Sequence, residues 1–189
     1  MSRLELLNKM INNFYDFLGI RKELTFEYQV DKLAFYKIFS SNVTDSSIHI
    51  KLPFESFTEK EKRYIGEVKF DRFQIRRKSS FTTNNSNFPY IFGKIKEVQK
   101  NVIKIDVEIN GAKYFFFLGI IGYLLVVIWV LTYLAKFSDF FLIPFSVFIF
   151  FTCLFIFQII STRYLVNQEI IDIERELSFH VSKANITSK

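Results

Sequence analysis

The chain has 189 residues with a formal net charge of +6, and 50% of its residues are hydrophobic. Its single cysteine, Cys153, excludes an internal disulfide, and its six scattered glycines exclude a phosphate-binding glycine loop. The two histidines, His49 and His180, stand far apart and match no zinc-ligand pattern. We therefore expect no metal site, no cofactor and no catalytic residue, and a protein that is not an enzyme.

Residues 1–20 place apolar side chains at steps of three and four, which predicts an amphipathic helix that ends near Gly19. Charged residues interrupt the segment, so it lacks the apolar core of a signal peptide. The apolar stripe either packs on the domain that follows or lies in a membrane interface. It consists of Leu4, Leu7, Ile11, Phe14 and Leu18, with Met10 and Phe17 beside it.

From residue 24 the apolar period changes to two, and residues 21–110 are predicted to form an antiparallel β-domain. Strands with no helical stretch between them predict a sheet that curls into a sandwich or barrel, which removes exposed edges. Seven short strands are expected, at residues 24–30, 33–40, 47–53, 63–70, 72–78, 89–97 and 102–110.

Two strand pairs are patterned clearly enough to predict a turn and a register. The alternation slips by one at Asp71-Arg72, which predicts a turn or a bulge there. Gly66 and Gly93 are expected to allow a bulge or the close approach of another group. In the last two strands we expect the inward pairs Ile91–Val107, Gly93–Ile105 and Ile95–Ile103, with Lys94 facing Lys104 on the other side.

The stretch 114–160 contains only two Asp, Glu, Lys or Arg residues, Lys136 and Asp139, and both lie near its centre. Residues 114–135 and 140–160 would form helices roughly 33 and 31 Å long, which fits a hydrocarbon core of about 30 Å. We therefore predict a transmembrane helical hairpin over residues 111–162, with these two spans. The alternative is a buried helical hairpin in a soluble protein, which would leave few residues to cover two helices that are apolar all round.

Lysines near the spans predict the orientation. Five of them, Lys94, Lys96, Lys100, Lys104 and Lys113, precede the first span closely, whereas only Lys136 lies beyond it. Lys and Arg are retained on the cytoplasmic side. We expect a multi-pass protein of the cell (inner) membrane with both termini cytoplasmic and with membrane lipid as its partner. Gly119 and Gly122 would allow close helix contact, and so a homo-oligomer through the hairpin.

Residues 163–189 continue with apolar residues at helical spacing from Val166 to Val181, which predicts a cytoplasmic amphipathic tail. Leu177, Phe179 and Val181 also alternate with a period of two. An eighth strand is therefore the alternative.

Basic residues of the β-domain are the candidate ligand- or lipid-binding site. A basic face held at the cytoplasmic leaflet would attract anionic lipid. The alternative is an ordinary solvated strand face with acidic neighbours such as Glu67, Asp71 and Glu97. Nucleic acid is not expected, because no interleaving of aromatic and basic residues suggests base stacking. The candidate residues are Arg72, Arg76, Arg77, Lys78, Lys94, Lys96 and Lys104.

The segments "YIGEVKFDRFQIRRKSS", "FPYIFGKIKE" and "VIKIDVEI" are followed at once by the apolar hairpin. This order resembles a group of small bacterial membrane proteins of unassigned function that have a β-rich domain beside two membrane helices. The resemblance covers about residues 63–160 and implies no functional residues. A looser similarity is to bacterial antiviral effectors that couple a nucleotide-sensing β-barrel to membrane helices, although there the helices precede the barrel.

These patterns together predict an α+β membrane protein with an antiparallel, barrel-like cytoplasmic domain, a two-helix transmembrane hairpin and amphipathic terminal helices. The expected function is a binding or sensing module for an anionic ligand, a lipid headgroup or a protein partner. Two alternatives stay open. One is a membrane-disrupting effector gated by the β-domain, and the other is an enzyme with a pocket in that domain.

Overall fold

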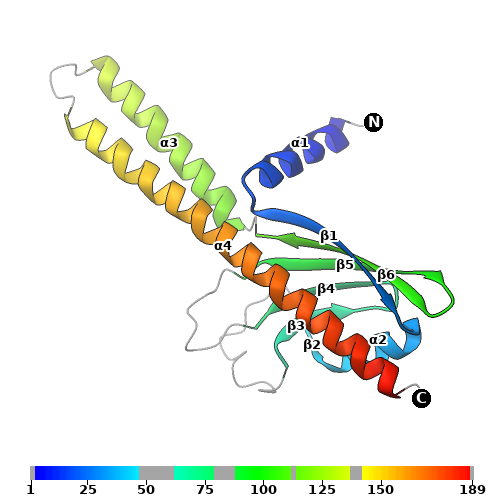
Figure 1. Cartoon of the computed structure of the whole chain (residues 1–189). Helices are drawn as coiled ribbons and strands as arrows, with labels where there is room; N and C mark the ends of the chain where they lie inside the picture. The colour runs from blue at the N-terminus through cyan, green and yellow to red at the C-terminus, as the bar shows by residue number, and fades with distance from the viewer. Residues whose placement is uncertain (1–2, 47–61, 79–87, 112–113, 137–141, 188–189) are drawn as a thin grey trace.

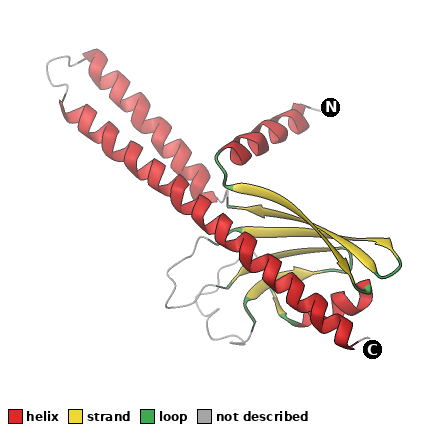
Figure 2. Cartoon of the chain, in the orientation of Figure 1, coloured by secondary structure: helices red, strands yellow, loops and turns green. Residues whose placement is uncertain are grey.

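The computed structural model describes residues 3–46, 62–78, 88–111, 114–136 and 142–187. Its strands form one sheet with the order β1-β6-β5-β4-β3-β2. Helix α2 and the C-terminal part of α4 cover one face of this sheet, while α1 and α3 lie outside that layer (Figures 1 and 2). The elements are α1 (Arg3–Phe17), β1 (Arg21–Gln29), α2 (Lys32–Ser41), β2 (Val43–Asp45), β3 (Tyr64–Val68), β4 (Arg72–Arg77), β5 (Tyr90–Gln99), β6 (Val102–Asn110), α3 (Tyr114–Lys136) and α4 (Leu142–Thr187).

The sheet is mixed and open. Strand β2 pairs with β3 in parallel, whereas the other neighbouring strands run antiparallel. Strands β1 and β2 lie at opposite ends of the strand order and form the two edges of the described sheet. The prediction of a wholly antiparallel, barrel-like sheet is therefore wrong. The sheet buries its apolar face under α2 and α4, so it has no need to close on itself.

Helix α2 replaces a predicted strand at residues 33–40. Asp31 caps this helix, because its carboxylate accepts a hydrogen bond of 2.8 Å from the N–H of Ala34. Phe35 and Phe39, one helical turn apart, are both fully buried and stack with their ring centroids 5.4 Å apart. An apolar run of eight residues fits either period, and the burial of both rings on one face favours the helix. The predicted strand at 47–53 lies outside the described residues.

The hydrophobic core lies between the sheet and the two covering helices. Isoleucines of β4, β5 and β6 meet the rings of α2 and an apolar stripe of α4 that contains Val166, Ile173 and Leu177, all fully buried. Burying each such side chain contributes about 1.5–3 kcal/mol. Because α4 continues to Thr187, the tail is helical, and the alternative of an eighth strand there is wrong.

In β5 and β6 the residues predicted to face inward do so, but the two strands pair in a different register from the predicted one. Ile91 pairs with Ile109, Gly93 with Val107 and Ile95 with Ile105, so the predicted pairing is wrong by two residues. The chain turns at Lys100-Asn101, where Asn101 adopts a left-handed φ of 63°, and a bulge near Glu97 absorbs one further residue. Lys94 therefore faces Asp106 instead of Lys104, and the Lys104 position faces Lys96.

The prediction that Gly66 and Gly93 allow a close approach is confirmed. A Cβ at Gly93 would overlap the ring of Phe73 on the neighbouring strand. Gly66 has a φ of 154°, and a Cβ there would lie 2.7 Å from the Cα of Ile75. At both positions the neighbouring strand occupies the space of the missing side chain.

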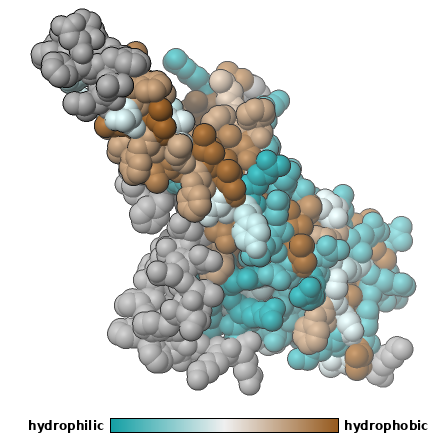
Figure 3. Space-filling model, turned by 60° about the vertical axis from the view of Figure 1, so that its left-hand side comes forward, coloured by the Kyte–Doolittle hydropathy of each residue, from teal (hydrophilic) through white to brown (hydrophobic). Residues whose placement is uncertain are grey.

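Helix α3 lies alongside the first part of α4 (Figure 1). The ring of Tyr123 stacks on that of Phe155 at 5.1 Å, and its hydroxyl lies 3.3 Å from the hydroxyl of Thr152. Among the described residues one helical stretch, Phe145–Thr187, is long and apolar enough to cross a membrane, and none of its most apolar window is buried. Gly119–Tyr133 is a shorter apolar stretch. Hydrophobic side chains dominate this part of the molecular surface, in contrast to the polar sheet domain (Figure 3).

Candidate functional site

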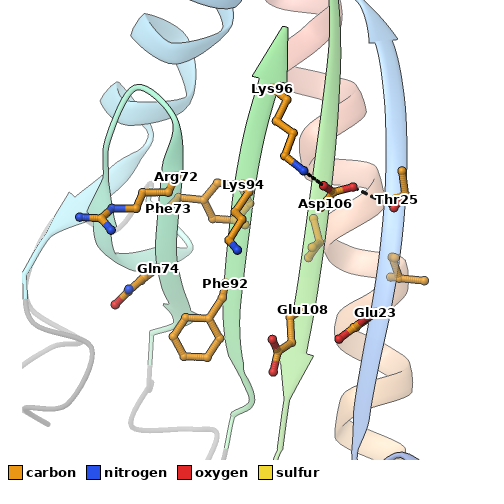
Figure 4. Close-up of a pocket in the computed structure, with 13 residues that line it drawn as sticks. Glu23, Thr25, Arg72, Phe73, Gln74, Phe92, Lys94, Lys96, Asp106 and Glu108 are labelled. Atoms are coloured by element: carbon orange, nitrogen blue, oxygen red, sulfur yellow. Dashed lines mark hydrogen bonds and ion pairs between the residues drawn. The ribbon is translucent and has the colours of Figure 1, made fainter. Parts of the chain in front are cut away.

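No described helix covers the second face of the sheet, and a groove of about 500 Å³ lies open there (Figure 4). Its lining comes from β1, β4, β5 and β6, whose outward side chains are polar because the inward ones form the core. Lys94 and Phe92 of β5 line one side, while Glu23 of β1 and Glu108 of β6 line the other. The groove therefore has a basic side and an acidic side.

The basic side chains of the groove differ in whether they make ion pairs. Lys96 donates a hydrogen bond of 2.8 Å to Asp106, which also accepts one of 3.0 Å from the hydroxyl of Thr25 (Figure 4). The hydrogen bond from Lys96 lowers the pKa of Asp106. Lys94 and Arg72 are cross-strand neighbours, both are exposed, and neither makes an ion pair within the described residues. Within the described residues, Lys94 and Arg72 are thus the cations of the groove that are open to a ligand.

The acidic side is organised by Arg21, which is buried at 7% exposure. Its Nε donates a hydrogen bond of 2.8 Å to Glu108, its Nη1 lies 3.1 Å from Asp16 of α1, and its Nη2 contacts Glu23. The hydrogen bond with Glu108 raises the pKa of Arg21, so this residue stays charged. One guanidinium shared by three carboxylates leaves this side of the groove negative.

The sequence did not indicate the role of Arg21, because its three partners come from three different elements. The sequence indicates a role for Arg21 only when β1 and β6 are known to be paired, because Glu23 and Glu108 then stand directly opposite each other. Two like charges in directly opposed positions destabilise the strand pair, and a cation between them offsets this.

The predicted basic residues do not form one surface. Arg72, Lys94, Lys96 and Lys104 lie on the open face. Arg76 is buried and donates to the carbonyl of Arg77 at 3.3 Å, and Lys78 follows the end of β4. Arg77 points to the covered face, where α4 lies.

A buried polar group joins the sheet to α4. Tyr64 of β3 donates a hydrogen bond of 2.8 Å to Glu169, whose side chain is 2% exposed. Arg77 lies 3.4 Å from the other carboxylate oxygen of Glu169 and also pairs with Asp172. Burial raises the pKa of Tyr64, and the charge of Glu169 raises it further. These contacts attach α4 to the sheet.

A second buried group lies further along α4. His180 is 1% exposed and packs edge-on against the ring of Phe39, and its Nε2 lies 3.1 Å from Glu176. The hydrogen bond with His180 lowers the pKa of Glu176. Within the described ranges no group of three or more His, Cys, Asp or Glu side chains is placed to hold a metal ion. His49 lies outside these ranges.

No family model, no curated protein and no solved structure matches this chain.

Proposed function

We propose that this chain is an integral membrane protein whose α3 and first part of α4 cross the bilayer as a two-helix hairpin, with the sheet domain on the cytoplasmic side as a binding module. The observation that carries this proposal is the exposure of large apolar side chains on both helices. Leu125 is 61% exposed, Phe157 69% and Ile160 61%. Each such residue near mid-membrane favours insertion by about 0.3–0.6 kcal/mol, whereas in water this surface would drive aggregation.

The short connection between the sheet and α3 supports a sheet domain that lies against the membrane surface. Strand β6 ends at Asn110 and α3 begins at Tyr114. Three intervening residues extend at most about 10 Å. The sheet domain would therefore lie at the cytoplasmic leaflet, where the lysines before α3 are attracted to anionic lipid.

The charge distribution of the groove supports a ligand that combines an anionic group with an amine. Lys94 makes no ion pair within the described ranges, and its Nζ, with Arg72 one strand away, favours a phosphate or carboxylate. The acidic side around Glu23 and Glu108 favours a positive group and repels polyanions. A phosphate next to a primary amine has this chemistry, either as a lipid headgroup or as a free phosphoamine.

Titration of the full chain in a non-ionic detergent with phosphoethanolamine tests this binding role. Lys94→Gln should weaken binding about tenfold to a hundredfold, because a hydrogen bond to a charged group is worth about 1.5–3 kcal/mol. Lys100→Gln, at an exposed lysine in the β5–β6 turn, is the matched control and should bind like the parent chain.

Two further measurements identify the source and the chemistry of the ligand. Inorganic phosphate, which lacks the amine, should bind more weakly than phosphoethanolamine. Mass spectrometry of the purified chain from mixed phosphatidylethanolamine and phosphatidylcholine micelles should show which lipid is retained. Binding of neither phosphoethanolamine nor phosphatidylethanolamine, or equal binding by Lys94→Gln, would contradict the proposal.

The continuity of α4 supports a second candidate, an effector in which the sheet domain gates the hairpin. One helix of 46 residues contains both the apolar stretch and the stripe that is buried on the sheet. A displacement of the sheet would therefore be transmitted directly to the apolar part. Release of dye from proteoliposomes on addition of phosphoethanolamine would favour this candidate over a passive anchor, and intact vesicles under all conditions would exclude it.

A further inference from the structure

Helix α1 exposes its apolar stripe. Leu7 is 57% exposed, Met10 62%, Phe14 46% and Phe17 86%. On α1 itself, Asn12 and Tyr15 are half-buried, and so is Leu18 of the predicted stripe, which follows the end of the helix. The expectation that the stripe packs on the sheet domain is therefore not met within the described residues, and the stripe must be covered by something else.

The C-terminal end of α1 is held firmly in the fold. Gly19 has a left-handed φ of 69°, and the N–H of Ile20 donates to the carbonyl of Tyr15 at 3.1 Å, which closes a Schellman motif. Asp16 of α1 pairs with Arg21 of β1. This end therefore has a fixed position relative to the sheet.

The same end of α1 lies beside the start of α3. The N–H of Gly111, three residues before α3, donates a hydrogen bond of 2.8 Å to the carbonyl of Ile20. On the other side, a Cβ at Gly19 would lie 3.1 Å from the Nε of Arg163 of α4. The C-terminal end of α1 therefore lies close to the start of the apolar helix α3.

From this level α1 projects sideways, across the direction in which α3 and α4 run (Figure 1). If α3 and α4 cross a bilayer, a helix in this position runs along the membrane surface. Its four charged residues, Arg3, Glu5, Lys9 and Asp16, sum to zero. The stripe is therefore the attractive part of α1, and anionic lipid is not required.

We propose that α1 lies in the interface of the same membrane, with Leu7, Met10, Phe14 and Phe17 inserted at the boundary of headgroups and acyl chains. This inference rests on the proposed transmembrane hairpin. It makes the exposed stripe of α1 continuous with the apolar surface of α3 and α4, so that one lipid phase covers both. The sheet domain is then held to the membrane at two places, which fixes the tilt of the groove relative to the surface.

The test uses the full chain with Cys153→Ser, reconstituted in phosphatidylcholine vesicles with or without phosphatidylglycerol. Single cysteines at Met10 or Phe14 carry an environment-sensitive bimane label. Asn8→Cys, on another side of α1, is the matched control, and Leu125→Cys reports on α3. Quenching is measured separately with nitroxide lipid and with aqueous iodide.

Labels at positions 10, 14 and 125 should be blue-shifted, quenched by nitroxide lipid and protected from iodide, and the label at 8 should show the reverse. Phosphatidylglycerol should not change these values. Protection at 125 with iodide quenching at 10 and 14 would overturn the inference and leave the hairpin standing, whereas iodide quenching at 125 would overturn the hairpin itself. A blue shift at 10 and 14 without quenching by nitroxide lipid would mean that protein, such as a second copy, covers the stripe, and would also overturn the inference.

Discussion

At position 93 the absence of a side chain determines how two strands pack. The ring of Phe73 occupies the space that a Cβ of Gly93 would fill, and Phe73 itself is 1% exposed. The sequence predicted this close approach because a glycine interrupts an alternating strand. It did not indicate which side chain would fill the gap, since the partner comes from another strand.

Gly93→Ala should destabilise the sheet domain by about 1–3 kcal/mol, because the added methyl group forces a buried ring out of position. The free energy of unfolding is measured by denaturant titration of the full chain in detergent. Gly122→Ala is the control, since no heavy atom lies within 4 Å of a Cβ at Gly122. Equal stability of the two variants would show that the Phe73 ring moves aside freely.

The alternation of the strands indicates, for most of the basic residues, on which face of the sheet they lie. Arg72 and Arg77 are five positions apart, so a regular strand places them on opposite faces, and the structure does so. Lys94, Lys96 and Lys104 share the open face as predicted. The carboxylates that divide this face into a basic and an acidic side could not be predicted, because they depend on the pairing of β1 with β6.

At the scale of elements, five predicted strands are present, as β1, β3, β4, β5 and β6, and the errors have local causes. The segment of α2 was too short for its period to distinguish helix from strand. The register of β5 and β6 was missed because the left-handed Asn101 allows a tight turn at Lys100-Asn101, which shifts the pairing by two residues. The attachment of α4 to the sheet through Tyr64 and Glu169 joins residues 105 positions apart, which no local pattern reveals.

That attachment predicts a specific loss of stability at high pH. The pKa of Tyr64 is raised above its ordinary value of 10.0 in the folded chain. Above pH 10 the unfolded chain therefore loses the Tyr64 proton while the folded chain keeps it. Since the folded state then binds more protons, the free energy of unfolding falls with rising pH, by up to about 1.4 kcal/mol per pH unit for one group.

Tyr64→Phe should remove this contribution. The free energy of unfolding of the parent chain should fall more steeply above pH 10 than that of the variant, and the two slopes should agree between pH 7 and pH 9. The measurement is denaturant unfolding in detergent at a series of pH values. Parallel slopes above pH 10 would show that Tyr64 ionises in the folded state as readily as in the unfolded one.

At the scale of the whole molecule, α4 connects the apolar part of the chain to the sheet. Its N-terminal part exposes Phe150 and Phe157, and its C-terminal part buries Ile173 and Leu177 in the core. The sequence predicted both parts from hydropathy and periodicity. Together with α3, this part of the helix has a mainly hydrophobic surface, whereas the surface of the sheet domain is mainly polar (Figure 3).

If the proposed hairpin is correct, lipid separates the far end of α3 from the sheet domain. Labelling of single cysteines, in the Cys153→Ser chain, with a membrane-impermeant maleimide in intact cells and in lysed cells measures this separation. Lys136→Cys marks the last residue of α3, and Lys183→Cys marks an exposed site of α4 beside the sheet. We expect labelling at 136 in intact cells and at 183 only after lysis, whereas labelling of both positions in intact cells, or of both only after lysis, would show that no membrane separates them.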